Sequence, residues 1–436
     1  MQKPQSVNHA AMGSGGPGMG PGRMGMGMGG PRPKMRLSAF SSLRIRNYRW
    51  LWFGMIGFFN SMQMQMVAGG WLVYTMTDSA MALGLVSAGA GVPMLLLSLV
   101  GGTVADRVRK RNLLLVTQTL IFFQMAIITI LIVTDLLALW HLVIASVVSG
   151  IIFSFAMPAR TAFIVDLVGQ DDLLNAVALN SMAMNICRIA SPALAGLLLK
   201  WIDIPGVYWV ILLSYGWGMF TTIMIPPGGT MAAKAEVPML KDMAEGLRFV
   251  RGNYYIMALM ILVFVPIFTA MPFQMLMPVF ARTVFQSGET GLGILMSAVG
   301  AGALVGSSIV ASLGDFRRKG VLMLASGIFF GAALILFGQS NSLRAGAFFL
   351  IFVGGGSSIF MTLTNTLILS NTPKELIGRV MSIFMMTFGL MPLGVLPAGA
   401  IAEAFGAPIT VIMGGGLLLV FILAATATQP RLRRLE

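Results

Sequence analysis

The sequence has few charged residues: they make up 10% of its 436 residues, whereas hydrophobic residues make up 57%. A soluble globular chain carries roughly 25% charged residues. This shortage excludes water as the main solvent, so the spanning elements must be helices or strands of a closed barrel. The apolar runs are of helix length, roughly 20 residues, and show no period-two alternation, which excludes the barrel. We expect an all-α integral membrane protein.

Cysteine and histidine are also scarce. Cys187 is the only cysteine, and His9 and His141 are the only histidines. This excludes a disulfide framework and leaves too few ligands for a Cys/His zinc site. The sequence also contains no Gly-x-x-x-x-Gly-Lys-Ser/Thr loop, so ATP binding is not expected. We expect no metal site, no cofactor and no enzyme activity.

Apolar runs of bilayer length predict twelve transmembrane helices in two sets of six. The first set covers residues 51–74, 83–104, 113–134, 139–157, 176–199 and 207–225. The second set covers residues 255–280, 291–313, 321–338, 345–370, 380–402 and 408–427.

The net charge of +14 would suggest nucleic acid if the basic residues formed one face of a folded domain. They lie instead in the N-terminal tail, in alternate loops and at the C-terminus, which is the positive-inside pattern. We therefore expect no nucleic-acid partner, a cytoplasmic (plasma) membrane location, and both termini in the cytoplasm.

The predicted spans divide the chain into five segments. Residues 1–38 form a tail rich in Gly, Met and Pro, and residues 39–225 form an N-terminal six-helix half. Residues 226–254 form a polar cytoplasmic linker, residues 255–428 a C-terminal half, and residues 429–436 a basic tail. The linker contains a short helical pattern that we expect to place four apolar residues against the bilayer surface: Leu240, Met243, Leu247 and Phe249.

Two short segments recur at similar places in the two halves. The loop Asp106-Arg107-Val108-Arg109-Lys110 matches Asp315-Phe316-Arg317-Arg318-Lys319, and residues 171–177 echo residues 374–380. The two matches indicate a duplicated six-helix unit. Such a duplication favours a cavity between the halves and transport by rocking one half against the other.

The loop from Gly102 to Arg111 resembles the signature of the major facilitator superfamily, with Arg109 where that family usually has Gly. Ser191, Pro192, Ala195 and Gly196 resemble its antiporter motif, whose small residues let helix backbones approach closely. Phe40 to Tyr74 and Pro158 to Ser181 resemble the enterobactin-exporter-like branch of drug and siderophore exporters. The resemblance implies the major facilitator fold.

The resemblance also implies a cytoplasmic gate in which Asp106 pairs across the helix bundle in one state and releases in the other. The expected gate residues are Gly102, Asp106, Arg107, Arg109 and Lys110, with Asp315, Arg317 and Arg318 as their counterparts. The alternative is that these basic residues serve only as a topology signal.

Arg188 lies about twelve residues, roughly 18 Å of helix rise, from either end of its span. A charge at that depth costs about 2.5–3.5 kcal/mol on insertion scales, so it should face a cavity or a partner. We expect it to contact an anionic substrate group or hold a gate; the alternative is a structural role. Uncharged polar residues within the spans should line the same cavity with Trp71 and Phe59, unless they only hydrogen-bond between helices: Asn60, Gln63, Gln65, Gln124, Asn185, Gln274 and Asn365.

No acidic residue is expected deep within a span, and Arg160 is expected just beyond the cytoplasmic end of the fourth span. We hypothesise that Asp106 or Asp135 carries a coupling proton. Pro392 and Pro397 are expected to break or bend the eleventh span.

Together these features predict a monomeric secondary transporter in a lipid bilayer that exports small amphipathic molecules, such as drugs, siderophores or metabolites, in exchange for protons. A facilitative uniporter, an importer and a non-transporting receptor with the same fold remain alternatives.

Overall fold

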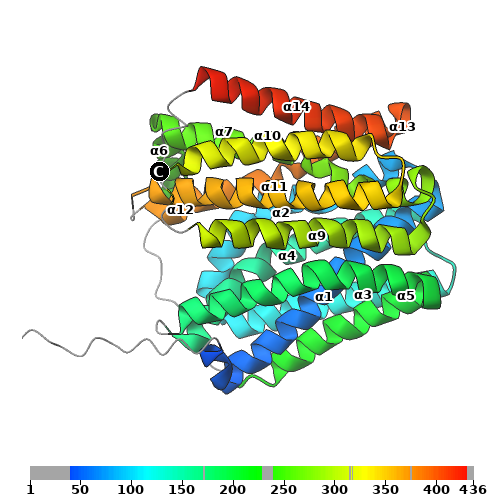
Figure 1. Ribbon diagram of the computed structural model, residues 1–436. Helices are drawn as coiled ribbons and strands as arrows, with labels where there is room; N and C mark the ends of the chain where they lie inside the picture. Colours follow the sequence, from blue (N-terminus) through cyan, green and yellow to red (C-terminus); the bar gives the residue numbers. More distant parts are fainter. Residues whose placement is uncertain are drawn as a thin grey trace, which may run out of the picture. The chain divides into compact units, whose positions relative to one another are not determined.

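The computed structural model describes residues 40–169, 172–227, 239–313, 316, 318–373 and 376–429. Within these ranges the chain is helical and contains no strand (Figure 1). The expected N-terminal tail, residues 430–436 of the C-terminal tail, residues 228–238 of the linker, and the gate residues Asp315 and Arg317 lie outside the described residues.

Five long helices form the N-terminal group, after a short 3-10 turn, η1 (Ser41–Arg44). They are α1 (Arg46–Thr77), α2 (Ala80–Arg107), α3 (Lys110–Val133), α4 (Leu139–Val168) and α5 (Leu173–Ile223). A shorter helix, α6 (Met239–Gly252), follows them.

The C-terminal group begins with α7 (Tyr254–Thr269), which continues through three short segments: η2 (Met271–Leu276), α8 (Met277–Val279) and η3 (Phe280–Val284). The remaining helices are α9 (Gly288–Ser312), α10 (Lys319–Gly338), α11 (Leu343–Ser370), α12 (Ile377–Gly389), α13 (Met391–Phe405) and α14 (Ala407–Thr428).

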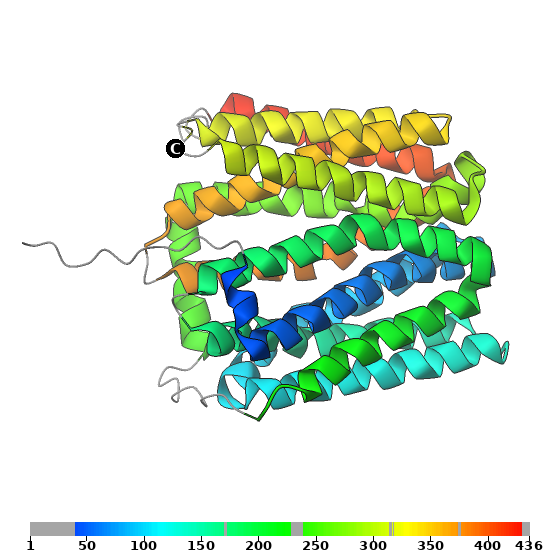
Figure 2. The same ribbon diagram turned by 60° about the horizontal axis from the view of Figure 1, so that its bottom comes forward.

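Nine helices of the described chain are long and apolar enough to cross a membrane. The α5 helix is one of these nine, although its 51 residues cover both the fifth and the sixth predicted spans. It breaks at Asp203, whose φ of 54° and ψ of −177° are not helical, and Pro205 follows. A straight helix of that length would be about 77 Å long, far beyond the roughly 30 Å of a hydrocarbon core. Figure 2 shows the two segments of α5 on either side of α1.

The eleventh predicted span is interrupted, as its proline and glycine content suggested. The break falls between the end of α12 at Gly389 and the start of α13 at Met391, and Pro392 occupies the first turn of α13. Proline is favoured there because the first helical N–H groups have no partner within the helix. Pro397 lies inside α13.

The two groups meet mainly through two helix pairs, α5 with α9 and α2 with α13. Glycine makes these contacts close. A Cβ at Gly196 of α5 would lie 2.6 Å from the carbonyl oxygen of Glu289 and 2.9 Å from the Cα of Gly293. Small residues are the usual means by which membrane helices approach closely. Pro192 and Gly196 of the antiporter-like sequence therefore lie at the α5–α9 contact, and Ser191 and Ala195 are buried.

The two ends of the helices differ in their excess of charge, which is acidic at one end and basic at the other. We call the end that contains Asp78, Asp135, Asp203, Glu289 and Glu403 the acidic end. We call the end that contains Arg107, Arg109, Lys110, Arg111 and Arg318 the basic end. Asp78, Asp135 and Asp203 all have positive φ values of 49–54°, a conformation that Asp tolerates better than most residues.

The α6 helix differs in part from the expected surface helix. Val250 is buried, Phe249 is partly buried, and Gly246 lies against Arg379 and Ile383 of α12. Glu245 pairs with Arg379 at 2.9 Å. Leu247 is exposed as expected, whereas the side chains of Leu240 and Met243 lie outside the described part. One face of α6, with Glu245 and Gly246, therefore packs on α12.

Candidate functional site

A cavity of about 280 Å³ lies between the N-terminal and C-terminal groups. We call it the central cavity. Helix α1 contributes four of its lining residues and α5 three, and the others come from η2 and α9. The full set is Phe59, Met62, Gln63, Met66, Met184, Arg188, Pro192, Gln274, Met296 and Val299. Of the residues that the sequence assigned to a cavity, the structure brings together Phe59, Gln63, Arg188 and Gln274.

Arg188 is the only charged residue among those lining residues. Its side chain has no hydrogen bond or ion pair with any residue that the structure describes, while its backbone is held firmly against α9. There, Ser297 Oγ donates to the carbonyl oxygen of Ile189 at 2.8 Å, and Gly300 lies against the Arg188 carbonyl. The helix contact thus fixes the backbone and leaves the guanidinium to the cavity.

Most of the remaining lining is soft and apolar. Met62, Met66, Met184 and Met296 come from three different helices. A thioether side chain is polarizable and has several rotatable bonds, so it adapts to ligands of different shape. Phe59 adds an aromatic surface, and Gln63 and Gln274 add amide groups that both donate and accept hydrogen bonds.

Five of the predicted cavity residues are not among the lining residues. Asn60 donates to Ser214 Oγ at 3.3 Å, Gln65 accepts from the Tyr215 hydroxyl at 2.8 Å, and Gln124 donates to Ser149 Oγ at 2.7 Å. These three bonds join helices within the N-terminal group. The three amides therefore take the alternative role, which is hydrogen bonding between helices. Asn185 and Asn365 also lie away from the lining, as does the buried Trp71.

Arg160 was placed wrongly by the sequence interpretation. Because α4 continues to Val168, Arg160 lies inside the helix, and only 5% of its surface is exposed. Its guanidinium carbon is 3.5 Å from the centre of the Phe58 ring and 5.7 Å from that of the Phe59 ring. Its Nη1 atom is buried and has no hydrogen-bond partner. Pro158 suggested a helix end, yet a membrane helix tolerates an internal proline.

The basic end holds an ion pair that the sequence did not predict. Lys110 Nζ lies 2.8 Å from both carboxylate oxygens of Asp166 in α4, and both side chains are largely buried. Lys110 therefore binds within the N-terminal group rather than across to the C-terminal group. Arg107, Arg109 and Arg318 are exposed, and a Cβ at Gly102 would meet nothing within 4 Å. The side chain of Asp106 lies outside the described part.

The acidic end holds several bonds between the N-terminal and C-terminal groups. Glu403 Oε2 of α13 accepts hydrogen bonds from Ser79 Oγ, Ala80 N and Met81 N at 2.7–3.2 Å. It thereby caps the N-terminus of α2, where the first N–H groups have no helical partner. Directly after α1, Asp78 pairs with Arg282 at 2.9 Å.

The neighbouring hydroxyl of Tyr74 shares a 2.7 Å hydrogen bond with Thr283. Asp135, by contrast, lies exposed in the turn between α3 and α4. The cross-group contacts of Glu403 and Arg282 could not be foreseen, because the paired residues are 204 or more positions apart.

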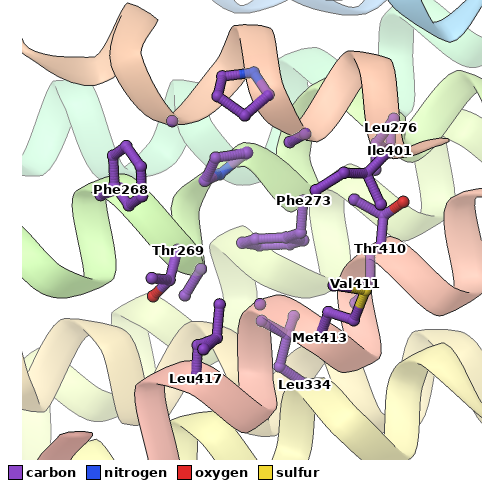
Figure 3. A pocket seen from close by; sticks show the side chains of 16 residues that line it. Phe268, Thr269, Phe273, Leu276, Leu334, Ile401, Thr410, Val411, Met413 and Leu417 are labelled. Carbon is purple, nitrogen blue, oxygen red and sulfur yellow. The ribbon is translucent and has the colours of Figure 1, made fainter. Parts of the chain in front are cut away.

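A second, smaller cavity of about 80 Å³ lies within the C-terminal group. Figure 3 shows Phe268, Phe273, Leu334 and Leu417 around it, and few polar atoms. The hydroxyls of its two threonines, Thr269 and Thr410, already donate to backbone carbonyls of their own helices. This cavity is therefore a packing gap with no free polar group to orient a ligand.

Membrane-length helices in two packed groups with a cavity between them form the architecture that solute transporters use. The chain belongs to the transmembrane secretion effector family of the major facilitator superfamily, because a model of that family matches residues 37–436. The resemblance seen in the sequence motifs is confirmed. The chain is a multi-pass membrane protein with efflux-type relatives.

Curated relatives cover most of the chain. The staphyloferrin A transporter of Staphylococcus aureus is 28% identical over 81% of this chain and 86% of its own length. The macrolide efflux protein A of Streptococcus pyogenes is 23% identical over 79% of this chain and 86% of its own. An enterobactin exporter of Shigella boydii is 27% identical over 75% of this chain and 76% of its own length.

Solved structures agree on the fold. The nucleoside transporter NupG superposes with a TM-score of 0.71 at 11% identity, covering 87% of this chain and 99% of its own. A bacterial homologue of the lysosomal transporter Spinster, in an inward-facing and unoccupied conformation, gives 0.68 at 14% identity, with coverage of 89% and 98%. At these identities the likeness concerns the fold alone.

Proposed function

We propose that this protein is a secondary active transporter that exports small amphipathic molecules by alternating access. The observation that carries the proposal is the central cavity, where Arg188 has no described protein partner and is surrounded by methionine, aromatic and amide side chains. A charged anchor within an adaptable apolar lining suits a ligand that has one charged and one apolar part. The efflux-type relatives support the direction of transport.

The proposed topology has twelve crossings in two six-helix halves. The nine apolar helices supply ten crossings if α5 is counted twice at its break, and α1 and the α12–α13 pair supply the other two. Residues 226–254 form the linker between the halves. The basic end then faces the cytoplasm, as the positive-inside rule requires. We propose that the protein works as a monomer in the plasma membrane.

Alternating access assigns roles to the two ends. The bonds of Glu403 and Arg282 join the two halves at the acidic end, and these bonds must break before the cavity can open there. The motif around Asp106 would gate the basic end, as the family resemblance implies. Lys110 and Asp166 would hold the adjoining ends of α3 and α4 together during the motion.

Protons are the proposed coupling ion. Of the two carboxylates that the sequence suggested, Asp106 remains a candidate, whereas Asp135 lies exposed in a turn and has no described bond to the C-terminal half. Glu403 is a better second candidate because its carboxylate joins the halves directly. Loss of these three hydrogen bonds would separate the N-terminus of α2 from α13 and loosen the acidic end.

The test is dye and drug uptake by inverted membrane vesicles that contain the wild type, Arg188→Ala or Arg344→Ala. Arg344 is exposed at the start of α11 and is not one of the cavity-lining residues. It therefore controls for the loss of one positive charge. We expect uptake by the wild type and Arg344→Ala that a protonophore abolishes, and at least a tenfold loss in Arg188→Ala. Uptake unaffected by the protonophore would favour a facilitative uniporter.

A further inference from the structure

The charges around the central cavity are all of one sign. Arg188 lines it, and the described lining residues include no carboxylate. A cation held in a low-dielectric site without a partner is costly. Such a site is stabilised when a ligand brings the missing negative charge.

A second unpaired cation lies directly behind the cavity wall. Phe59 lines the cavity, and its ring centre is 5.7 Å from the Arg160 guanidinium carbon. Arg160 is 5% exposed, and its Nη1 atom is buried without a hydrogen-bond partner. Phe58 covers one face of the guanidinium at 3.5 Å, but an aromatic face offsets only part of a full positive charge.

We infer that the central cavity selects anionic amphiphiles, binding a carboxylate-class group at Arg188 and the apolar part among its methionines and Phe59. The inference rests on the proposed function and specifies its substrate class. Arg188 can bind a carboxylate with two parallel N–H donors, and the amides of Gln63 and Gln274 can donate to its remaining lone pairs. Arg160 is a positioning residue that adds positive potential through Phe59.

The same charges disfavour cations. A cationic amphiphile would enter a cavity that has one unpaired arginine in its lining and another behind it, and like charges repel more strongly in a partly buried site than in bulk water. Charge sign, rather than size or shape, is therefore the main property by which this cavity discriminates between ligands.

The test is equilibrium binding of two fluorescent xanthene dyes of similar size and opposite charge to the purified full-length chain. The anion is carboxyfluorescein and the cation is the methyl ester of rhodamine. The variants are Arg188→Gln, Arg188→Lys and Arg160→Met, with Arg344→Gln as the control for charge loss outside the cavity. Benzoate and benzylamine are tested as competitors of the anionic dye on the wild-type protein. This part of the experiment does not depend on the folding of any variant.

We expect saturable carboxyfluorescein binding that is about tenfold or more weaker in Arg188→Gln, largely kept in Arg188→Lys and unchanged in Arg344→Gln. Benzoate should displace the dye and benzylamine should not. Arg160→Met should lower the ratio of anion to cation affinity, whereas a purely structural role would weaken both dyes equally.

The inference is overturned if wild-type protein binds no carboxyfluorescein saturably, if Arg188→Gln leaves its affinity unchanged, or if benzylamine competes as well as benzoate. Because binding is measured without transport, the two proposals can fail separately. Anion-selective binding without vesicle uptake would contradict the proposed export and leave this inference standing. Vesicle uptake of a cationic dye that is lost in Arg188→Ala, without saturable carboxyfluorescein binding, would overturn this inference and leave the proposed export standing.

Discussion

At the scale of single residues, the most informative group is the buried guanidinium of Arg160. It lies within α4 against Phe58, and its Nη1 atom has no partner. Removing a charge from water without pairing it destabilises the folded protein. A residue that lowers stability in this way is typical of functional sites, where stability is traded for activity.

We therefore predict that Arg160→Met raises stability and lowers transport. Methionine can occupy much of the same volume and still contact Phe58, and loss of the unpaired charge should stabilise the protein by roughly 1–3 kcal/mol. Thermal unfolding in detergent and vesicle uptake measure the two effects on one preparation. A lower melting temperature would show that the arginine is paired or needed for folding.

Residue identity also explains what the sequence could and could not reveal. Arg188 was placed at the cavity from its depth in an apolar run alone, because few structural roles tolerate a mid-span charge. Gln124 and Asn60 have the same pattern in the sequence, yet their amides bond to neighbouring helices. Neutral polar residues form hydrogen bonds within a helix bundle as readily as they line a cavity. Their position in the sequence therefore does not separate the two cases.

At the scale of elements, the α5–α9 contact depends on glycine. We predict that Gly196→Ala destabilises the protein by about 1–3 kcal/mol and slows transport. The added methyl would meet the Glu289 carbonyl and Gly293. Gly416→Ala in α14 is the matched control, because a Cβ there meets nothing within 4 Å and alanine favours a helix. Equal melting temperatures for the two variants would contradict the close contact.

Helix boundaries were the less predictable part of the elements. The apolar runs predicted where long helices lie, but α4 continues past Pro158 for ten residues to Val168. Arg160 is therefore buried inside the helix, and Asp166 lies next to Lys110. Composition cannot fix such an end when the last turns of the helix themselves contain proline and charged residues, here Pro158, Arg160 and Asp166. The break at Gly389 was foreseen, because proline and glycine disrupt helices for local reasons.

At the scale of the whole molecule, the opposite charges of the two ends predict orientation. A cysteine at Thr134 of the acidic end should react with a membrane-impermeant thiol reagent in intact cells, and one at Arg109 of the basic end should not. Both substitutions are made in a Cys187→Ser background, since Cys187 is the only native thiol, and both positions are exposed. Labelling at Arg109→Cys but not at Thr134→Cys would invert the assignment.

The sequence did not predict which residues form contacts with partners far along the chain. The six-helix repeat indicated two groups and a cavity, but it did not show which residues join the groups. Glu403 and Ser79 are 324 positions apart, and neither side chain is unusual in its local sequence. Only the packing of α2 on α13 brings them together.

The central claim is that the two halves must separate at the acidic end during each transport cycle, and a reversible cross-link tests it most directly. A Cβ built on Gly84 lies 3.5 Å from the Cα of Gly399, and a Cβ built on Gly399 lies 3.5 Å from the Cα of Gly84, so cysteines at these two positions are close enough to be cross-linked. In a Cys187→Ser background, we predict that Gly84→Cys/Gly399→Cys stops transport when oxidised and regains it after reduction. Transport by the fully cross-linked protein at the rate of its reduced form would contradict alternating access.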